Sequence, residues 1–165
     1  MIQIHESETI AMSYSPITRK GMARLKEELE RLQTVERPDV IKAIAEARAH
    51  GDLSENAEYH AAKERQAIIL GRIDELQMKI GSSQVVEAAG PYTKCVFGAT
   101  VTMENVDTDE QLTYTLVGPH ESDPENGLLS IAAPIGKAIL GLREGDAFLL
   151  KQSGVEAEFR IVSVE

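Results

Sequence analysis

Two carboxylates, Asp52 and Glu55, lie three residues apart in the segment 51–60 (Gly-Asp-Leu-Ser-Glu-Asn-Ala-Glu-Tyr-His). At the start of a helix this spacing places both side chains on one face. Two carboxylates are too few for a Ca²⁺ site, which takes about six to eight oxygen ligands. They suit a Mg²⁺ ion that keeps several waters and receives further ligands from a partner. The spacing is therefore compatible with part of a shared magnesium site.

The same spacing also fits a purely structural role. In a capping box, Asp52 would cap the N-terminus of a helix and Glu55 would reach back from the third helical position. The spacing alone does not decide between a helix cap and a metal ligand pair.

Basic residues flank the acidic pair. Arg48 lies about one helical turn before Asp52, and Lys63 about two turns after Glu55. Together they predict a basic patch behind the acids that could hold a phosphate backbone, although a solvated helix with ordinary ion pairs has the same composition. Asn56 and Glu58 complete the polar cluster, and we expect them to support it.

Residues 16–84 have the periodicity of two long helices, with Gly51 at the turn between them. Apolar residues repeat at steps of three and four on both sides of that turn, which predicts an antiparallel coiled-coil hairpin with the acids at its tip. The wide seam is Met22, Leu25, Leu29 and Leu32 with Ile69, Ile73, Leu76 and Ile80, and Ile41, Ile44, Ala45, Ala61 and Ala62 continue it toward the tip. Pro38 should kink or break the first helix near residues 36–37.

After a linker at residues 85–92, residues 93–165 have the composition of a small antiparallel β-rich domain with one short helix. We predict strands at 96–103, 111–117, 128–131, 146–151 and 155–164, and a helix at 134–140. Residues 1–15 are predicted to be a disordered extension. The fold class is therefore α+β.

Composition excludes several classes of function. The 165-residue chain carries a formal net charge of −10, which argues against coating duplex nucleic acid. No apolar run approaches the roughly 20 residues of a membrane span. The single cysteine, Cys95, is expected to be a buried, inert thiol in a reducing cytoplasm. The sequence has no Gly-rich phosphate loop or nucleophile motif, so we expect neither a self-contained enzyme nor a small-molecule substrate.

Five segments resemble one family, the bacterial transcript cleavage factors. The resemblance is most specific at residues 51–65, the predicted tip, and extends over residues 16–29, 37–41, 97–101 and 134–141. It implies an N-terminal coiled coil and an FKBP-like C-terminal domain. It also implies entry of the coiled coil into the secondary channel of backtracked RNA polymerase, whose own active site then cleaves the nascent RNA near its 3′ end.

The resemblance assigns roles to individual residues. Asp52 and Glu55 match the acids that help to hold the second catalytic Mg²⁺ of the polymerase, and Arg48 and Lys63 match the basic patch that contacts RNA. Asp123 and Pro134 are the expected docking residues at the channel rim. No cofactor is expected to bind the isolated protein. The chain departs from the family at Ala133, where serine is common, and in the loop 119–126.

Three other functions are compatible with parts of the sequence. An inhibitory relative would occupy the same channel without promoting cleavage, but such relatives have an altered, more acidic tip. An FKBP-like domain could be a proline isomerase, which requires an aromatic-lined pocket. A plain coiled-coil interaction protein would leave the residues of the tip unexplained.

Overall fold

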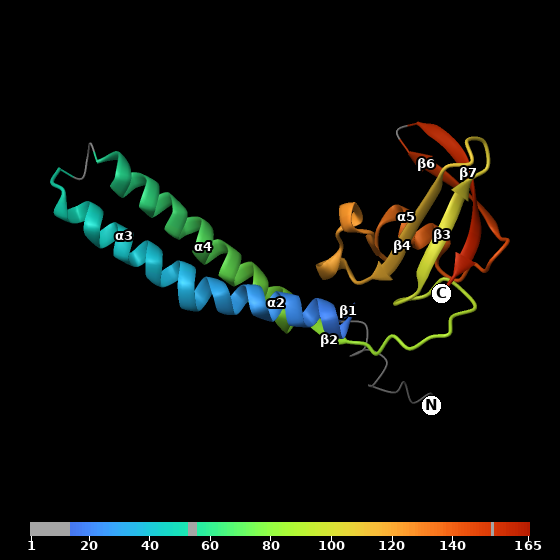
Figure 1. Cartoon of the computed structure of the whole chain (residues 1–165), viewed down its shortest axis with the longest axis horizontal. Coiled ribbons are helices and arrows are strands. Elements are labelled where there is room, and N and C mark those ends of the chain that lie inside the picture. The colour runs from blue at the N-terminus through green and yellow to red at the C-terminus, as the bar shows by residue number, and fades with distance from the viewer. Residues whose placement is uncertain (1–13, 53–55, 153) are drawn as a thin grey trace, which may run out of the picture. The chain divides into compact units, whose positions relative to one another are not determined.

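The computed structural model describes residues 14–52, 56–152 and 154–165, which form two compact units. One unit, Met22–Ser82, is a helical hairpin whose two arms lie side by side (Figure 1). Its first arm consists of α2 (Arg19–Arg31), a π-helical turn η1 (Leu32–Glu36) and α3 (Arg37–Ala49), and its second arm is α4 (Ala57–Gly81). The predicted antiparallel hairpin is confirmed.

An apolar seam holds the two arms together. Its wide part is as predicted, with Leu25 and Leu32 packed in the first arm and Ile69, Ile73 and Leu76 buried in the second. Nearer the tip the prediction was wrong in part: Val40, Ile44 and Ala47 are the buried residues of α3, whereas Ile41 is 49% exposed. Ala45 and Ala61 are exposed as well.

The π-helical turn explains why the seam is displaced. Leu25 and Leu32 are seven residues apart, and a regular repeat would place the next core residue at Asp39. A π turn inserts one extra residue into the helix, so the core position moves to Val40. The irregularity lies just before Pro38, where a break was predicted, but the helical course resumes at once in α3 with that proline near its start.

An ion-pair network, the Arg72 network, crosses the hairpin on its surface. Arg72 on α4 binds Glu28 on α2 through two parallel contacts, Nε to Oε1 at 2.7 Å and Nη2 to Oε2 at 3.0 Å. Its Nη1 also donates to Glu75 at 2.8 Å, and Lys79 approaches the other oxygen of Glu75 at 2.6 Å. Lys79 and, to a smaller extent, Arg72 hold the pKa of Glu75 at about 2, and Arg72 lowers the pKa of Glu28.

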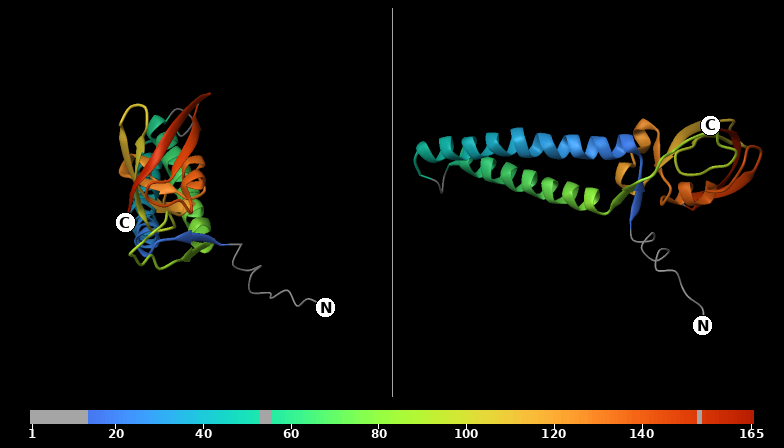
Figure 2. Two further views of the ribbon diagram at one scale, coloured as in Figure 1. Left: turned by 90° about the vertical axis from the view of Figure 1, so that its right-hand side faces the viewer. Right: turned by 90° about the horizontal axis from the view of Figure 1, so that it is seen from below.

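The second unit comprises the described residues up to Gly21 together with Ser83–Glu165. Its centre is a five-stranded sheet in the order β5-β4-β3-β7-β6. Figure 2 shows the ribbon of this unit from two further directions. The elements are β3 (Thr100–Asn105), β4 (Gln111–Val117), β5 (Leu128–Ser130), α5 (Pro134–Ile139), β6 (Ala147–Gln152) and β7 (Val155–Val164), with short 3₁₀ turns η2 (Pro119–Glu121) and η3 (Pro124–Asn126). This confirms the predicted β-rich domain with one short helix.

Several details of this unit differ from the prediction. The pair β4–β5 is parallel, because residues 118–127 cross over between the two strands and do not form a hairpin. The strand predicted at 96–103 begins only at Thr100. A second, two-stranded parallel sheet was not predicted; it pairs β1 (Ser15–Ile17) with β2 (Ser83–Val85). Ser15, expected to end the N-terminal extension, thus belongs to a strand, and residues 1–13 lie outside the described part.

The core of the sheet unit contains the thiol and most of its aromatic rings. Cys95 is fully buried beside Val101, Met103 and Ile161, as predicted, and burial raises the pKa of its thiol to about 11. Phe159 is buried and stacks on Phe148 with ring centroids 5.7 Å apart. Tyr92 and Tyr114 pack against the same core. These rings are therefore used for packing.

Candidate functional site at the hairpin tip

The tip of the hairpin begins where α3 ends. His50 closes the last turn, with its backbone N–H donating to the carbonyl of Ala47 at 3.2 Å. Gly51 follows at φ +119°, a conformation that a residue with a side chain rarely adopts, and the chain turns there. Asp52 comes next and is exposed to solvent. Glu55, the second predicted ligand, lies outside the described residues, so its placement stays a prediction.

The second arm starts at Asn56. The Asn56 Oδ1 atom accepts a hydrogen bond from the backbone N–H of Tyr59 at 3.0 Å, which makes Asn56 the N-cap of α4. Its Nδ2 atom donates to the backbone carbonyl of Ala47 on α3 at 2.8 Å. One side chain thus caps one arm and fastens it to the other. Asn56 was expected to support the tip, and the hydrogen bond that it makes across the turn to Ala47 could provide this support.

This cap overturns the capping-box interpretation of the acids. That interpretation requires Asp52 to cap the helix, but α4 starts at Ala57 and its cap is Asn56. Asn56 is suited to be the cap because its side-chain amide can accept a hydrogen bond from Tyr59 and donate one to Ala47 at the same time. An ionised carboxylate can only accept. Asp52 therefore lies in the turn ahead of the helix cap, not within it.

A surface hollow surrounds Asp52. It is lined by His50, Asp52, Asn56, Ala57 and Glu58, so Glu58 shares the hollow with the predicted metal ligand. Within the described ranges, no three His, Cys, Asp or Glu side chains are grouped so that they could hold a metal ion. The carboxylate of Asp52 in this hollow is a hard oxygen ligand of the type that Mg²⁺ binds, one or two at a time.

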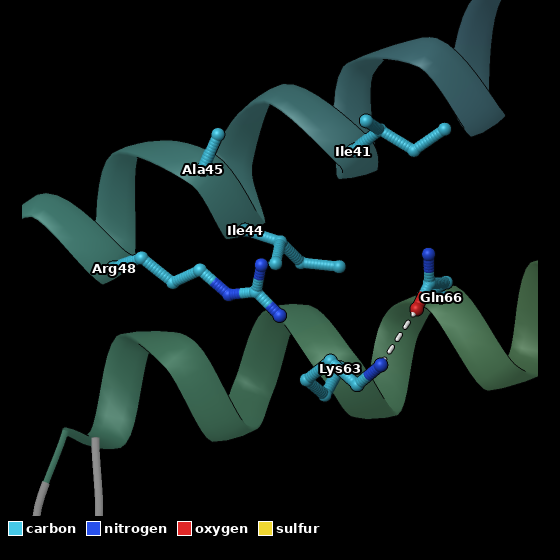
Figure 3. A pocket seen from close by; sticks show the side chains of 6 residues that line it. All are labelled: Ile41, Ile44, Ala45, Arg48, Lys63 and Gln66. Carbon is cyan, nitrogen blue, oxygen red and sulfur yellow. Dashed lines mark hydrogen bonds between the residues drawn. The ribbon is translucent and has the colours of Figure 1, made fainter.

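Arg48 and Lys63 lie together behind the tip, as the basic patch requires. They line one groove with Ile41, Ile44, Ala45 and Gln66, in which Arg48 reaches from α3 toward α4 (Figure 3). Among the described residues neither cation makes an ion pair; Lys63 Nζ instead donates to Gln66 Oε1 at 3.1 Å. Two positive groups above an apolar floor could bind a phosphodiester and the sugar or base beside it.

An aromatic side chain places one of the cations. The guanidinium carbon of Arg48 lies 5.9 Å from the centroid of the Tyr59 ring, a cation–π contact between the two arms. Tyr59 also meets the ring of His60 edge to face at 5.6 Å. The contacts of Tyr59 and Gln66 were not predicted from the sequence. The spacing alone could not show which residues of α4 face Arg48, because that depends on the register between the arms.

The expected docking residues lie in the other unit, on the segment between β4 and α5. Asp123 forms an isolated bridge with Leu128 at the start of β5, and its Oδ2 atom accepts from Asn126 Nδ2 at 2.7 Å. Pro134 is exposed and is the first residue of α5, after Ala133. Both residues have structural roles in this segment, and their docking role remains a prediction.

Known proteins resemble this chain over almost its full length. The family model described as the N-terminal domain of the GreA/GreB transcription elongation factors matches residues 15–85, and the model of the GreA/GreB C-terminal domain matches residues 91–165. The transcription elongation factor GreA of Cereibacter sphaeroides is 51% identical over 153 residues, covering 93% of this chain and 98% of that protein. GreA of Xylella fastidiosa strain 9a5c is 47% identical, covering 92% and 97%.

Solved structures were matched as well. The transcription factor Gfh1 is 28% identical with a TM-score of 0.45, covering 92% of this chain and 97% of that chain. A GreA/GreB factor of Nitrosomonas europaea is 26% identical with a TM-score of 0.41, covering 91% and 98%. The assignment to a family rests on the sequence matches, which span both units. The chain belongs to the family of GreA/GreB transcription elongation factors.

Proposed function

We propose that this protein enters the secondary channel of backtracked bacterial RNA polymerase and stimulates cleavage of the nascent RNA near its 3′ end, which rescues arrested complexes. The observation that carries the proposal is the position of Asp52. It lies in the turn between two packed helices, ahead of the α4 cap, where it is exposed. The 25 residues of α4 extend about 37 Å, so the tip can reach an active site that lies inside a larger protein.

The protein is proposed to complete the active site of the polymerase and not to be an autonomous enzyme. Asp52, and Glu55 by prediction, would contribute carboxylate oxygens to a Mg²⁺ ion shared with the polymerase. When bound there, such an ion can activate water and stabilise the leaving oxygen. Asn56 fixes the ends of the two arms next to Asp52, and Glu58 adds negative charge to the same hollow.

The basic patch would hold the substrate. Arg48 and Lys63, in one groove on the tip side of the hairpin, are proposed to contact phosphates near the extruded 3′ end of the RNA. The partners are thus RNA polymerase, at its channel and rim, and nascent RNA. No helix within the described ranges has the length and apolar character of a membrane span. A role on bacterial polymerase places the protein in the cytoplasm.

The experiment is a cleavage assay on a stalled, backtracked elongation complex. We expect the wild-type protein to release short 3′ RNA fragments, and Asp52→Asn and Glu55→Gln to lower the rate about 100-fold while leaving polymerase binding nearly unchanged. Lys42→Gln, an exposed change away from the tip, is the matched control and should be fully active. Equal losses of cleavage and of binding, measured by competition with the wild type, would contradict the metal-ligand role.

The alternatives make different predictions in the same assay. An inhibitory relative would bind the polymerase and slow elongation without releasing fragments. A proline isomerase would act on a peptide substrate, but Phe159 is buried in the core and Tyr92, Tyr114 and Phe148 pack against it. We therefore expect no isomerase activity.

A further inference from the structure

A buried carboxylate meets the first turn of α2. Glu121 is only 7% exposed, and it is 103 residues away in sequence from the residue that it binds. Its Oε1 atom accepts from the backbone N–H of Thr18 at 2.7 Å, and its Oε2 atom accepts from the Thr18 hydroxyl at 2.6 Å. Within the described part of the chain no cation forms an ion pair with Glu121. These hydrogen bonds must therefore offset the cost of burying the charge.

The contact completes a helix cap that α2 cannot complete alone. Thr18 precedes the helix, and its hydroxyl accepts from the backbone N–H of Gly21 at 2.9 Å, as an N-cap residue does. In a capping box the third helical residue is Glu or Gln, which binds the backbone N–H of the cap. Here that residue is Gly21, which has no side chain. Glu121 supplies the missing carboxylate from a distant segment.

Two glycines allow the segments to approach this closely. A Cβ atom on Gly21 would lie 1.9 Å from Glu121 Oε2, inside the space that the carboxylate fills. A Cβ atom on Gly118 would lie 1.7 Å from the carbonyl oxygen of Pro16. The loop after β4 therefore fits against β1 and the first turn of α2 only with glycine at these two positions.

The same carboxylate also organises the loop in which it lies. Glu121 Oε1 accepts from the backbone N–H of Gly118 at 3.3 Å and so closes the short turn η2. Two residues further on is Asp123, an expected docking residue, whose backbone bonds to Leu128. All of these residues belong to the sheet-containing unit, and α2 continues from it into the hairpin. The helix that leads to the tip thus starts from the docking segment.

We infer that Glu121 is a positioning residue for cleavage: it anchors the start of the helix that leads to the tip on the segment that docks. The inference rests on the proposed function. The backbone bonds between Asp123 and Leu128 do not involve this carboxylate, so without it the segment around Asp123 can still bind polymerase. The helix, however, no longer starts from a fixed point. The tip carboxylates then reach the reacting phosphate in the correct place less often.

The test separates this anchor from an ordinary helix cap. Glu121→Ala removes the anchor and the carboxylate of the helix cap. The double variant, Gly21→Glu with Glu121→Ala, places a carboxylate at the third helical position and restores a cap within α2 alone. Glu125→Ala changes an exposed glutamate of the same loop and is the matched control. Each full-length variant is measured for the maximal cleavage rate, for the concentration that gives half of that rate, and for hydrogen exchange of the Thr18 and Gly21 amides.

We expect Glu121→Ala to lower the maximal rate about tenfold or more, because a misplacement of order 1 Å can cost ~100-fold. The half-saturating concentration should change little. The double variant should recover amide protection but not the rate, and Glu125→Ala should match the wild type. Recovery of the rate by the double variant, or an unaltered rate in Glu121→Ala, would overturn the positioning role of Glu121. Neither result would contradict the proposed function. Failure of the wild type to stimulate cleavage would overturn the proposed function and this inference with it.

Discussion

Asn56 shows how one residue can define the geometry of the tip. Its side-chain amide makes two hydrogen bonds. It accepts one from the backbone of Tyr59 on its own helix and donates one to the carbonyl of Ala47 on the other helix. The packing beneath is thin, because the buried side chains of α3 diminish to Ala47 near its end. A polar bond thus takes over at the tip the role that apolar packing has at the base.

This arrangement predicts unequal effects for two substitutions of Asn56. Asn56→Ala should lower the free energy of unfolding by about 1 kcal/mol for the lost cap, with roughly 0.5–1.5 kcal/mol more for the bond to Ala47. Asn56→Asp keeps the acceptor and loses only the donor, so it should retain the helix cap. Both should slow cleavage, because the tip is no longer fastened across the turn.

Chemical denaturation and the cleavage assay together check this prediction. Glu64→Gln, an exposed change further along α4, is the control for stability and should unfold like the wild type. If Asn56→Asp were as stable and as active as the wild type, the bond to Ala47 would have no role in positioning the tip.

A second prediction at this scale concerns Mg²⁺. Because the tip offers only Asp52 and, by prediction, Glu55, we expect the free protein to bind Mg²⁺ with a dissociation constant on the order of millimolar or weaker. Isothermal titration of the isolated protein measures this directly. Micromolar binding would mean that the protein holds the ion by itself, contrary to a shared site.

At the scale of elements, the sequence predicted what depends on local periodicity. The two helical arms, the turn at Gly51, the strands 111–117 and 155–164 and the helix after Pro134 all follow from local patterns and turn residues. The π turn at residues 32–36 could not be predicted in this way, since no single residue requires it. One inserted residue places Val40 in the core in place of Asp39, and the predicted core residue Ile41 is exposed.

Contacts between distant segments were also missed. The strand Ser15–Ile17 is too short for a periodic signal and exists because it pairs with Ser83–Val85. Glu121 lies in the loop 119–126, and nothing in its local sequence indicates that it is buried against Thr18. For the site, Asp52 lies in the turn, and Arg48 and Lys63 line one groove on the two arms behind it; their roles stay predictions. The partners of Arg48 and Asn56 depend on the register of the arms, which local patterns do not give.

The Arg72 network gives a pH-dependent prediction for the hairpin. Glu75 has a pKa of about 2 in place of its ordinary 4.5, and the pKa of Glu28 is lowered as well. A carboxylate whose pKa is lower in the folded state stabilises the fold. This stabilisation is complete at a pH above the pKa of the unfolded state and is lost as the pH falls through the pKa of the folded state. We therefore expect the contribution of the network to disappear progressively from about pH 4.5 toward pH 2.

Thermal unfolding of the wild type and of Arg72→Gln across this pH range tests the assignment. The variant should melt at a lower temperature at pH 7, and the difference should shrink as the pH falls below 4.5. Lys42→Gln, which breaks a more exposed pair with Glu46 at 3.8 Å, is the control and should change little. A difference between wild type and Arg72→Gln that stays constant with pH would show that Arg72 acts by packing and not by charge.

At the scale of the whole molecule, the division into two units suggests a division of labour. The hairpin carries the proposed chemistry at its tip, and the sheet unit carries the expected docking residues. The first residues of the described chain belong to the sheet unit, where Ile17 is fully buried and Thr18 binds Glu121. The chain therefore starts in the sheet unit, continues along the hairpin and returns to the sheet unit.

Separating the units should separate the two activities. Residues 12–84 alone should form the hairpin through its Leu and Ile seam and stimulate cleavage weakly at high concentration. Residues 85–165 alone should bind polymerase, compete with the whole protein and stimulate nothing. The full chain should exceed the hairpin fragment by about 100-fold or more at low concentration, because docking makes entry of the tip into the channel intramolecular.

Cleavage assays on the two fragments, alone and mixed, measure this difference. Circular dichroism first establishes that each fragment is folded, since the sheet fragment loses Ile17 and exposes the Glu121 carboxylate that Thr18 binds in the whole protein. Mixing the fragments should restore little activity at low concentration, because the covalent link that supplies the effective concentration is gone. Cleavage stimulated by the sheet fragment alone, or none from a folded hairpin at any concentration, would place the chemistry at the other end of the molecule.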